Sequence, residues 1–289
     1  MHRRPSMNLF ARSCRSLCLA FAGAVTIAAH GQTTPAQPAV VIDTTGSQAL
    51  AASQSPATMI LEAIGTMPSD GTYKASASAM AALRQAIQTA GPSLQVDPSQ
   101  ATPSFCSGAT YLVFVSVLAR LNREDRLQWD QDTATALKVT NQIDGTGIWG
   151  RWNANGPGTA RLFYELGLGR NFTSLDEAQP GDFLKIFWTE EIGAREIGHS
   201  VIYLGRGIQP DGEPFIRYWS SNEPNGYGIA KVPLRRIKRM LFSRLEHPEA
   251  IVRQRQIPSR DGYLAAMLKR SSTEAEMLQM AGLTAPASH

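Results

Sequence analysis

Hydrophobic side chains recur with a helical period in the first half of the chain. Two segments, residues 57–67 and 76–91, each carry apolar residues along one face, and the second ends at the stop signal Gly91-Pro92. Residues 106–122 (CSGATYLVFVSVLARLN) are apolar on nearly all sides. This pattern predicts a helix that is buried at the centre of the fold.

The second half of the chain shows the shorter pattern of strands. β-branched and aromatic runs bounded by Gly, Pro and Asp predict strands at residues 183–188, 199–205 and 214–221, and a further strand at residues 240–244. The segment of residues 205–213 contains three glycines and a proline and predicts a hairpin loop. Helices followed by an antiparallel sheet indicate an α+β fold.

The connecting segments give weaker patterns. Residues 122–160 are polar at first and then rich in Gly and Trp, which predicts a long surface loop. A short helix is expected at residues 159–169 (TARLFYELGLG). From about residue 260 the chain predicts a helix with one polar face (YLAAMLKR), followed by a tail.

The first residues have the pattern of a secretory signal peptide. Four arginines precede an apolar run over residues 17–29, small residues follow it, and no acidic residue occurs before Asp43. The run is shorter than the roughly 20 residues of a membrane span, so we expect a leader over residues 1–31, with a retained membrane anchor or a buried helix as the alternative. Residues 32–56 are rich in Thr, Ala, Ser, Gln and Pro, which indicates a flexible spacer.

The charge of the chain lies largely in this leader. The sequence has 28 basic and 24 acidic residues, and removing the four leader arginines leaves 24 of each. A balanced chain has no general attraction for polyanions, so we expect no nucleic-acid partner. We also expect no stable membrane span once the leader is removed.

Cysteine usage singles out one thiol. Cys14 and Cys18 belong to the leader, so Cys106 is the only cysteine of the expected mature chain. A disulfide within one chain is then excluded, and a lone thiol in an oxidising compartment is exposed to oxidation. Such a residue is either buried and inert or retained for its reactivity.

The position of Cys106 favours reactivity. We expect the central helix to begin between Ser104 and Cys106, because Ser is a good N-cap and Pro103 disfavours helix before it. The positive end of the helix dipole stabilises a thiolate there, and the unpaired amides of the first turn can bind a developing oxyanion.

His199 is the candidate base for this thiol. It opens a predicted strand beside a turn, whereas the other four histidines lie in the leader, at a polar bend or at the C-terminus. A lone histidine on a strand is usually structural. A thiol nucleophile, however, needs a base within hydrogen-bond reach, and that base needs a third group to orient its ring.

Candidates for the third group cluster at the end of the next predicted strand. Asn222 can accept a hydrogen bond from the imidazole, and Ser220 shares its face of the strand because side chains alternate with a period of two. Ser221 points to the other face, unless the strand bends near Pro224. Asn222 is our choice, with Ser220 and Ser221 as alternatives.

Three of these segments, in this order, resemble the NlpC/P60 family of cell-wall cysteine peptidases. FCSGATYLVF is similar to the nucleophile segment of the family, QPGDFLKIFW to its Pro-Gly-Asp strand and GHSVIYLGRG to its Gly-His strand. The resemblance covers residues 100–245. It implies a papain-like core that hydrolyses amide bonds in peptidoglycan stem peptides, with Cys106 as nucleophile and His199 as base, and no cofactor.

The chain departs from the family pattern at two places. Phe105 replaces the usual acidic residue before the cysteine, and the third catalytic residue of the family is commonly a histidine where this chain offers Ser220, Ser221 and Asn222. The related CHAP amidases often use a carboxylate or Asn as third member. Both differences concern the subfamily and the substrate.

The resemblance divides the chain into a leader, a spacer, a helical N-terminal extension over residues 57–99, the catalytic domain over residues 100–245, and a C-terminal helix and tail over residues 246–289. The extension is expected to act as a lid, a helical part of the domain or a binding module. The predicted loop of residues 122–160 is expected to shape a substrate cleft. Its Trp149 and Trp152 either stack on substrate or anchor the loop to the core.

No sequence spacing indicates a metal site, since CxxC and HExxH patterns are absent. The expected protein is therefore a periplasmic or secreted cysteine hydrolase that acts on peptidoglycan or a peptide. Two rival functions remain, a papain-like acyltransferase and a catalytically silent domain that binds the cell envelope. An antibacterial effector delivered to competitors is a third, which the leader disfavours.

Overall fold

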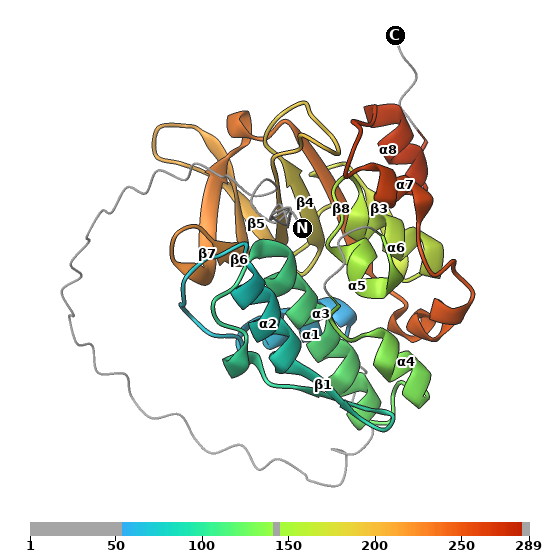
Figure 1. Ribbon diagram of the computed structural model, residues 1–289. Helices are drawn as coiled ribbons and strands as arrows, with labels where there is room; N and C mark the ends of the chain where they lie inside the picture. Colours follow the sequence, from blue (N-terminus) through green and yellow to red (C-terminus); the bar gives the residue numbers. More distant parts are fainter. Residues whose placement is uncertain (1–53, 141–144, 285–289) are drawn as a thin grey trace, which may run out of the picture.

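The computed structural model describes residues 54–140 and 145–284 and has an α+β architecture (Figure 1). Its central element is α3 (Cys106–Arg123), the helix predicted from the apolar run. Tyr111 to Val115 are all fully buried. Other elements therefore surround the helix on all sides, which is why the sequence shows no polar stripe along it.

A six-stranded antiparallel sheet packs against α3. Its strands lie in the order β3-β8-β4-β5-β6-β7. They are β3 (Gly169–Phe172), β4 (Phe183–Phe187), β5 (Gly198–Ile208), β6 (Pro214–Asn222), β7 (Gly226–Pro233) and β8 (Arg239–Leu245). Four of them match predicted strands, whereas β3 and β7 are short or glycine-containing and were not predicted.

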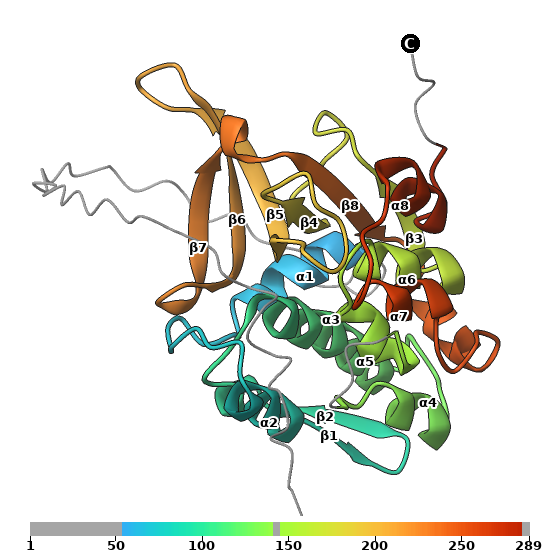
Figure 2. The same ribbon diagram turned by 45° about the horizontal axis from the view of Figure 1, so that its top comes forward.

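The two faces of the sheet bury different clusters. Phe183, Ile202 and Trp219 belong to the core that contains α3. Val201 and Tyr218, whose side chains alternate with these along β5 and β6, belong to a second cluster on the opposite face. The hairpin of β5 and β6 projects beyond the other strands (Figure 2). Because β5 continues to Ile208, its loop is shorter than the predicted one.

The predicted leader, residues 1–31, and most of the predicted spacer lie outside the described residues. The last spacer residues belong to the fold. Ser55 caps α1 (Pro56–Ile64), since its hydroxyl accepts a hydrogen bond from the Thr58 amide at 3.2 Å. Ser55 and Pro56, the last residues of the predicted spacer, therefore belong to this helix and its cap.

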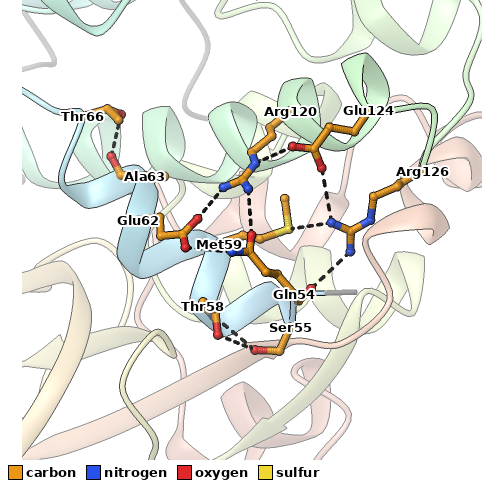
Figure 3. Close-up of polar contacts among 10 residues, drawn as sticks. All are labelled: Gln54, Ser55, Thr58, Met59, Glu62, Ala63, Thr66, Arg120, Glu124 and Arg126. Atoms are coloured by element: carbon orange, nitrogen blue, oxygen red, sulfur yellow. Dashed lines mark hydrogen bonds and ion pairs between the residues drawn. The ribbon is translucent and has the colours of Figure 1, made fainter. Parts of the chain in front are cut away.

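Polar contacts fix α1 against the C-terminal end of α3 (Figure 3). The Arg120 guanidinium pairs with Glu62 at 2.5 Å and with Glu124 at 2.7 Å. Such exposed pairs contribute about 0–1 kcal/mol each. Met59 and Ile60 are each 1% exposed in the same cluster as α3. Burial at about 1.5–3 kcal/mol per side chain therefore holds α1 in place.

The predicted helix over residues 76–91 is wrong in its second part. It ends at Ala86 (α2, Ala77–Ala86) and continues as a hairpin of β1 (Ile87–Ala90) and β2 (Ser93–Val96). Gly91 takes a positive φ of 60° at the turn, a conformation that favours glycine. A short 3₁₀ helix, η3 (Pro98–Gln100), then leads toward α3.

Residues 122–160 are not the surface loop that the sequence predicted. They contain α4 (Gln131–Ala136) and α5 (Gly147–Trp152), followed by α6 (Gly158–Leu166). Arg151 is fully buried, where its guanidinium pairs with Glu165 at 2.6 Å and donates to three backbone carbonyls. Paired and fully hydrogen-bonded, this cation can lie in the core.

The C-terminal segment packs beside α5 and α6 (Figure 1). It contains the 3₁₀ helix η5 (Pro248–Arg255), α7 (Gly262–Ala266) and α8 (Glu274–Met280), and another 3₁₀ turn, η4 (Leu234–Arg236), precedes β8. The predicted C-terminal helix is thus shorter than expected, and a second helix occupies part of the predicted tail. Within the described ranges, no helix is long and apolar enough to span a membrane.

Candidate active site

Cys106 is the first residue of α3 and is buried at 4% exposure, with its thiol in no disulfide. The residue before it, Phe105, occupies the N-cap position and has no side-chain group that can cap the helix. The first bond of the helical ladder runs from Ala109 N to Phe105 O at 2.9 Å. The amides of the first turn, including that of Cys106, therefore lie outside the ladder.

Ser104 does not cap the helix, contrary to the prediction. Its hydroxyl bonds the hydroxyl of Ser221 at 2.7 Å, across 117 residues of chain. Ser221 is the second-last residue of β6, so this bond holds the start of α3 at the end of the sheet. Both hydroxyls are buried, and each satisfies the other.

His199 and Asn222 meet at this same end of the sheet. His199 is the second residue of β5 and Asn222 is the last residue of β6. The register of Ile202 opposite Trp219, continued to the strand ends, sets the two side chains opposite each other. Their contact is a hydrogen bond of 3.1 Å between Nε2 of the imidazole and Oδ1 of the amide.

The amide of Asn222 fixes the protonation of the ring. Its Nδ2 donates to the carbonyls of Ser220 at 3.2 Å and Gly228 at 2.9 Å, and a carbonyl can only accept. The oxygen Oδ1 must therefore face the imidazole, and Nε2 of a neutral His199 must carry the proton. The lone pair of the ring is then on Nδ1.

Of the three candidates for the third residue, Asn222 is the one that bonds the imidazole. The hydroxyl of Ser220 donates to the Ser200 carbonyl at 2.7 Å, and Ser221 bonds Ser104. Alternation places Ser221 on the face toward α3 and Asn222 on the opposite face. His199 lies on the Asn222 face too.

Two aromatic side chains that the sequence reasoning missed enclose the imidazole. Trp188 lies nearly parallel to it with ring centres 6.3 Å apart, and Tyr218 meets it edge-on at 5.5 Å. His199 is 7% exposed as a result. Trp188 follows β4 two residues after Ile186, the register partner of His199, so the strand alternation could have revealed it.

A second set of contacts links the start of α3 to the segment before His199. The Ser107 hydroxyl donates to the side-chain oxygen of Asn153, just after α5. Two residues on, Asn155 Nδ2 donates to the Gly193 carbonyl at 2.9 Å. Together with the Ser104–Ser221 bond, these contacts form a ring around the region where α3 begins and β5 starts.

Glu196 holds the segment before His199 in place. One carboxylate oxygen accepts the amides of Gly156 at 2.6 Å and Gly193 at 3.1 Å, and the other pairs with Lys185 Nζ at 2.6 Å. The C-terminal segment adds a bridge between Gly193 and Ser271. A buried carboxylate with this many partners fixes the backbone that leads into β5.

The predicted N-terminal extension also reaches this region. Ser104 forms backbone hydrogen bonds with Thr72 and Lys74, and the amide of Tyr73 donates to the Pro224 carbonyl at 3.1 Å. Tyr227 fixes the neighbouring segment, since its hydroxyl donates to the Ala101 carbonyl at 2.8 Å. Burial raises the pKa of this phenol, which therefore stays neutral and keeps donating.

Trp149 and Trp152 are buried, so they do not form the exposed stacking surfaces that were expected to contact substrate. They are 1% and 2% exposed and pack on Tyr111 at ring-centre distances of 5.0 and 5.4 Å. The Trp152 indole donates to the Ser107 carbonyl at 3.2 Å. Both residues thus take the alternative role of anchoring their segment to α3.

Among residues 54–140 and 145–284, no group of three or more His, Cys, Asp and Glu side chains is arranged to hold a metal ion. The chemistry that these residues offer is that of a thiol, an oriented imidazole and hydrogen-bond donors. No model of a known protein family matches the chain, and neither the curated proteins nor the solved structures compared with it include a match.

Proposed function

We propose that the protein is an exported cysteine hydrolase of the NlpC/P60 type, with a papain-like core that cleaves amide bonds in peptidoglycan stem peptides. The observation that carries this proposal is the His199–Asn222 hydrogen bond, because the fixed amide leaves Nδ1 as the basic nitrogen. This hydrogen bond lies at the same end of the sheet as the start of α3, whose first residue is Cys106. Export rests on the signal-peptide pattern of residues 1–31.

In the proposed reaction, the Cys106 thiolate approaches Nδ1 of His199 around the end of the sheet. The thiolate attacks an amide carbonyl, and first-turn amides of α3 stabilise the oxyanion. The imidazolium gives its proton to the leaving amine, and a thioester remains. Water then resolves the thioester, with His199 taking a proton from it. Asn222 holds the orientation of the ring throughout and selects the tautomer with a proton on Nε2 whenever the ring is neutral.

Alkylation of Cys106 by iodoacetamide as a function of pH tests the thiol–imidazole pair. The mature chain is compared with His199→Ala and Asn222→Ala, and Cys106→Ala is the control for labelling at other residues. We expect a thiol that titrates well below about 8.5 and loses this property without His199. Asn222→Ala should lower hydrolysis by about 2- to 13-fold, since it removes a hydrogen bond of about 0.5–1.5 kcal/mol that selects the tautomer.

Product analysis separates the proposed hydrolase from its rivals. Muropeptides from Gram-negative cell walls are incubated with the mature chain, with and without an added amine acceptor, and analysed by mass spectrometry. Hydrolysed products that disappear in Cys106→Ala support the proposal. Products joined to the amine would indicate an acyltransferase. A thiol that is inert, or that titrates normally in all variants, would leave an envelope-binding domain as the better assignment.

A further inference from the structure

The hydrogen bonds around the start of α3 include one polar side chain that has no role in the mechanism proposed above. Asn153 follows α5 as its C-cap residue and is half-buried between two buried neighbours, Trp152 and Ala154. Its side-chain oxygen accepts the hydroxyl hydrogen of Ser107, the residue after Cys106. Its amide nitrogen therefore points away from Ser107 with two hydrogens to donate.

This nitrogen can donate hydrogen bonds, but it has no acceptor among the residues that the structure describes. In the part of the chain that the structure describes, no hydrogen bond from Asn153 Nδ2 is found, and the atom is not sealed from solvent. By contrast, the side-chain nitrogens of the nearby Asn155 and Asn171 donate to the carbonyls of Gly193 and Ala160. Of the three amides, that of Asn153 keeps its donors available beside the first turn of α3, where it contacts Ser107.

The segment around Asn153 is held rigidly on both sides. The Trp152 indole donates to the Ser107 carbonyl and to the Thr110 hydroxyl, both at 3.2 Å, which ties α5 to the first turn of α3. On the other side, the Gly156 amide donates to the buried Glu196 at 2.6 Å. A donor fixed in this way needs little reorganisation when charge develops next to it.

We propose that Asn153 donates a hydrogen bond to the oxyanion that forms when Cys106 attacks an acyl carbonyl. This inference rests on the proposed hydrolase function and adds a catalytic residue to it. As the carbon–sulfur bond forms, the π electrons of the carbonyl move to its oxygen, and an N–H of Asn153 stabilises that charge without giving up its proton. When the carbonyl re-forms, the carbon–nitrogen bond breaks and the amine leaves with the proton from His199.

Asn153→Ala and Asn153→Asp in the mature chain test the assignment. Both remove the donor, but Asp keeps an oxygen that accepts the Ser107 hydroxyl. With muropeptides as substrate, we expect kcat to fall about 10²- to 10³-fold in Asn153→Ala, the loss typical of one oxyanion donor, and KM to change only a few-fold. Asn153→Asp should lose at least as much, because it adds a negative charge. Ser107→Ala keeps the Asn153 donor and removes only the hydrogen bond that holds the Asn153 side chain. Its kcat should therefore fall less than that of Asn153→Ala.

A second readout separates catalysis from structure. Alkylation of Cys106 by iodoacetamide is a substitution at a saturated carbon and forms no oxyanion, so Asn153→Ala should alkylate at the wild-type rate. An active wild type whose Asn153→Ala variant keeps its kcat would overturn this inference and leave the hydrolase proposal intact. A variant that loses alkylation and hydrolysis together would show a structural role. A wild type that cleaves nothing would overturn both proposals.

Discussion

Replacing Glu196 by Gln tests whether this carboxylate holds the segment that leads to His199. The Glu196 side chain is 1% exposed. One of its oxygens pairs with Lys185 Nζ, and the other accepts hydrogen bonds from the amides of Gly156 and Gly193. An amide has only one oxygen. Whichever way Gln turns, its NH₂ group therefore faces a donor, either the ammonium or the two backbone amides.

The cost can be worked from these contacts. Hydrogen bonds to charged groups contribute about 1.5–3 kcal/mol, and a buried donor left unsatisfied costs about 1–3 kcal/mol. We expect Glu196→Gln to lower the free energy of unfolding by about 3 kcal/mol. For a domain of this size, about 2–4 °C of Tm corresponds to 1 kcal/mol, so Tm should fall by about 6–12 °C.

Urea denaturation followed by circular dichroism measures this loss. Glu177→Gln is the matched control, because it makes the same change in an ion pair with Arg170 whose side chains are 42% and 48% exposed. The control should change stability by less than about 1 kcal/mol. If Glu196→Gln and Glu177→Gln cost the same, Glu196 does not hold the segment, and the reasoning fails. A double-mutant cycle with Lys185→Met isolates the ion pair.

Two further predictions concern stability. Ala at Gly226 (φ +81°) would place its Cβ 2.0 Å from the Gly71 carbonyl, whereas Ala at Gly212 (φ +86°) would meet nothing within 4 Å. Both changes strain the backbone by about 1–2 kcal/mol, so urea titration should show Gly226→Ala as the less stable variant, and equal stabilities would contradict the clash. Hydrogen bonding from Arg270 lowers the pKa of Glu276 to about 2, from an ordinary 4.5. The folded pKa is the lower one, so the stabilisation is complete above about pH 5 and is lost as the pH falls toward 2. At 31% and 44% exposure the pair is discounted to about 1 kcal/mol. Glu276→Gln should thus be less stable than wild type at pH 7 and approach it as the pH falls through 2, and a difference that does not shrink in acid would refute this linkage.

The pairing of His199 with Asn222 could be predicted only in part. Alternation sets which residues of β6 share a face of the sheet, but the register of β5 and β6 shifts between Tyr203 and Gly205, so the hairpin loop alone does not set the partner of His199. The alternation continues through β6 to Asn222, and the bend expected near Pro224 begins only after it. The sequence favoured Asn222 over Ser220 although both share a face, and the structure separates them, since Asn222 bonds the imidazole and Ser220 bonds the Ser200 carbonyl.

The segment around Trp149 could not be predicted because its partners are distant in sequence. A glycine-rich segment that contains an arginine predicts an exposed loop. The Arg151 guanidinium is neutralised by Glu165 and donates to the carbonyls of Gly145 and Pro258, the latter 107 residues away. Nothing local to residues 145–152 indicates these contacts.

Local propensity also failed where a tertiary contact decided the outcome. Residues 76–91 are rich in alanine and favour helix throughout. The chain nevertheless forms a hairpin from Ile87, whose fully buried side chain packs with Leu83 and Leu94 in the core of α3. In the same way, the Ser104 hydroxyl bonds Ser221 instead of capping the helix that follows.

The hydrogen bond between Ser104 and Ser221 also bears on the order in which the molecule matures. It joins residues 117 positions apart in the sequence, so it forms only after β6 has been synthesised. Under the proposed function, Cys106 lacks until then the imidazole that would deprotonate it. On that proposal a chain still being made carries an unreactive Cys106, and completion of the fold activates it.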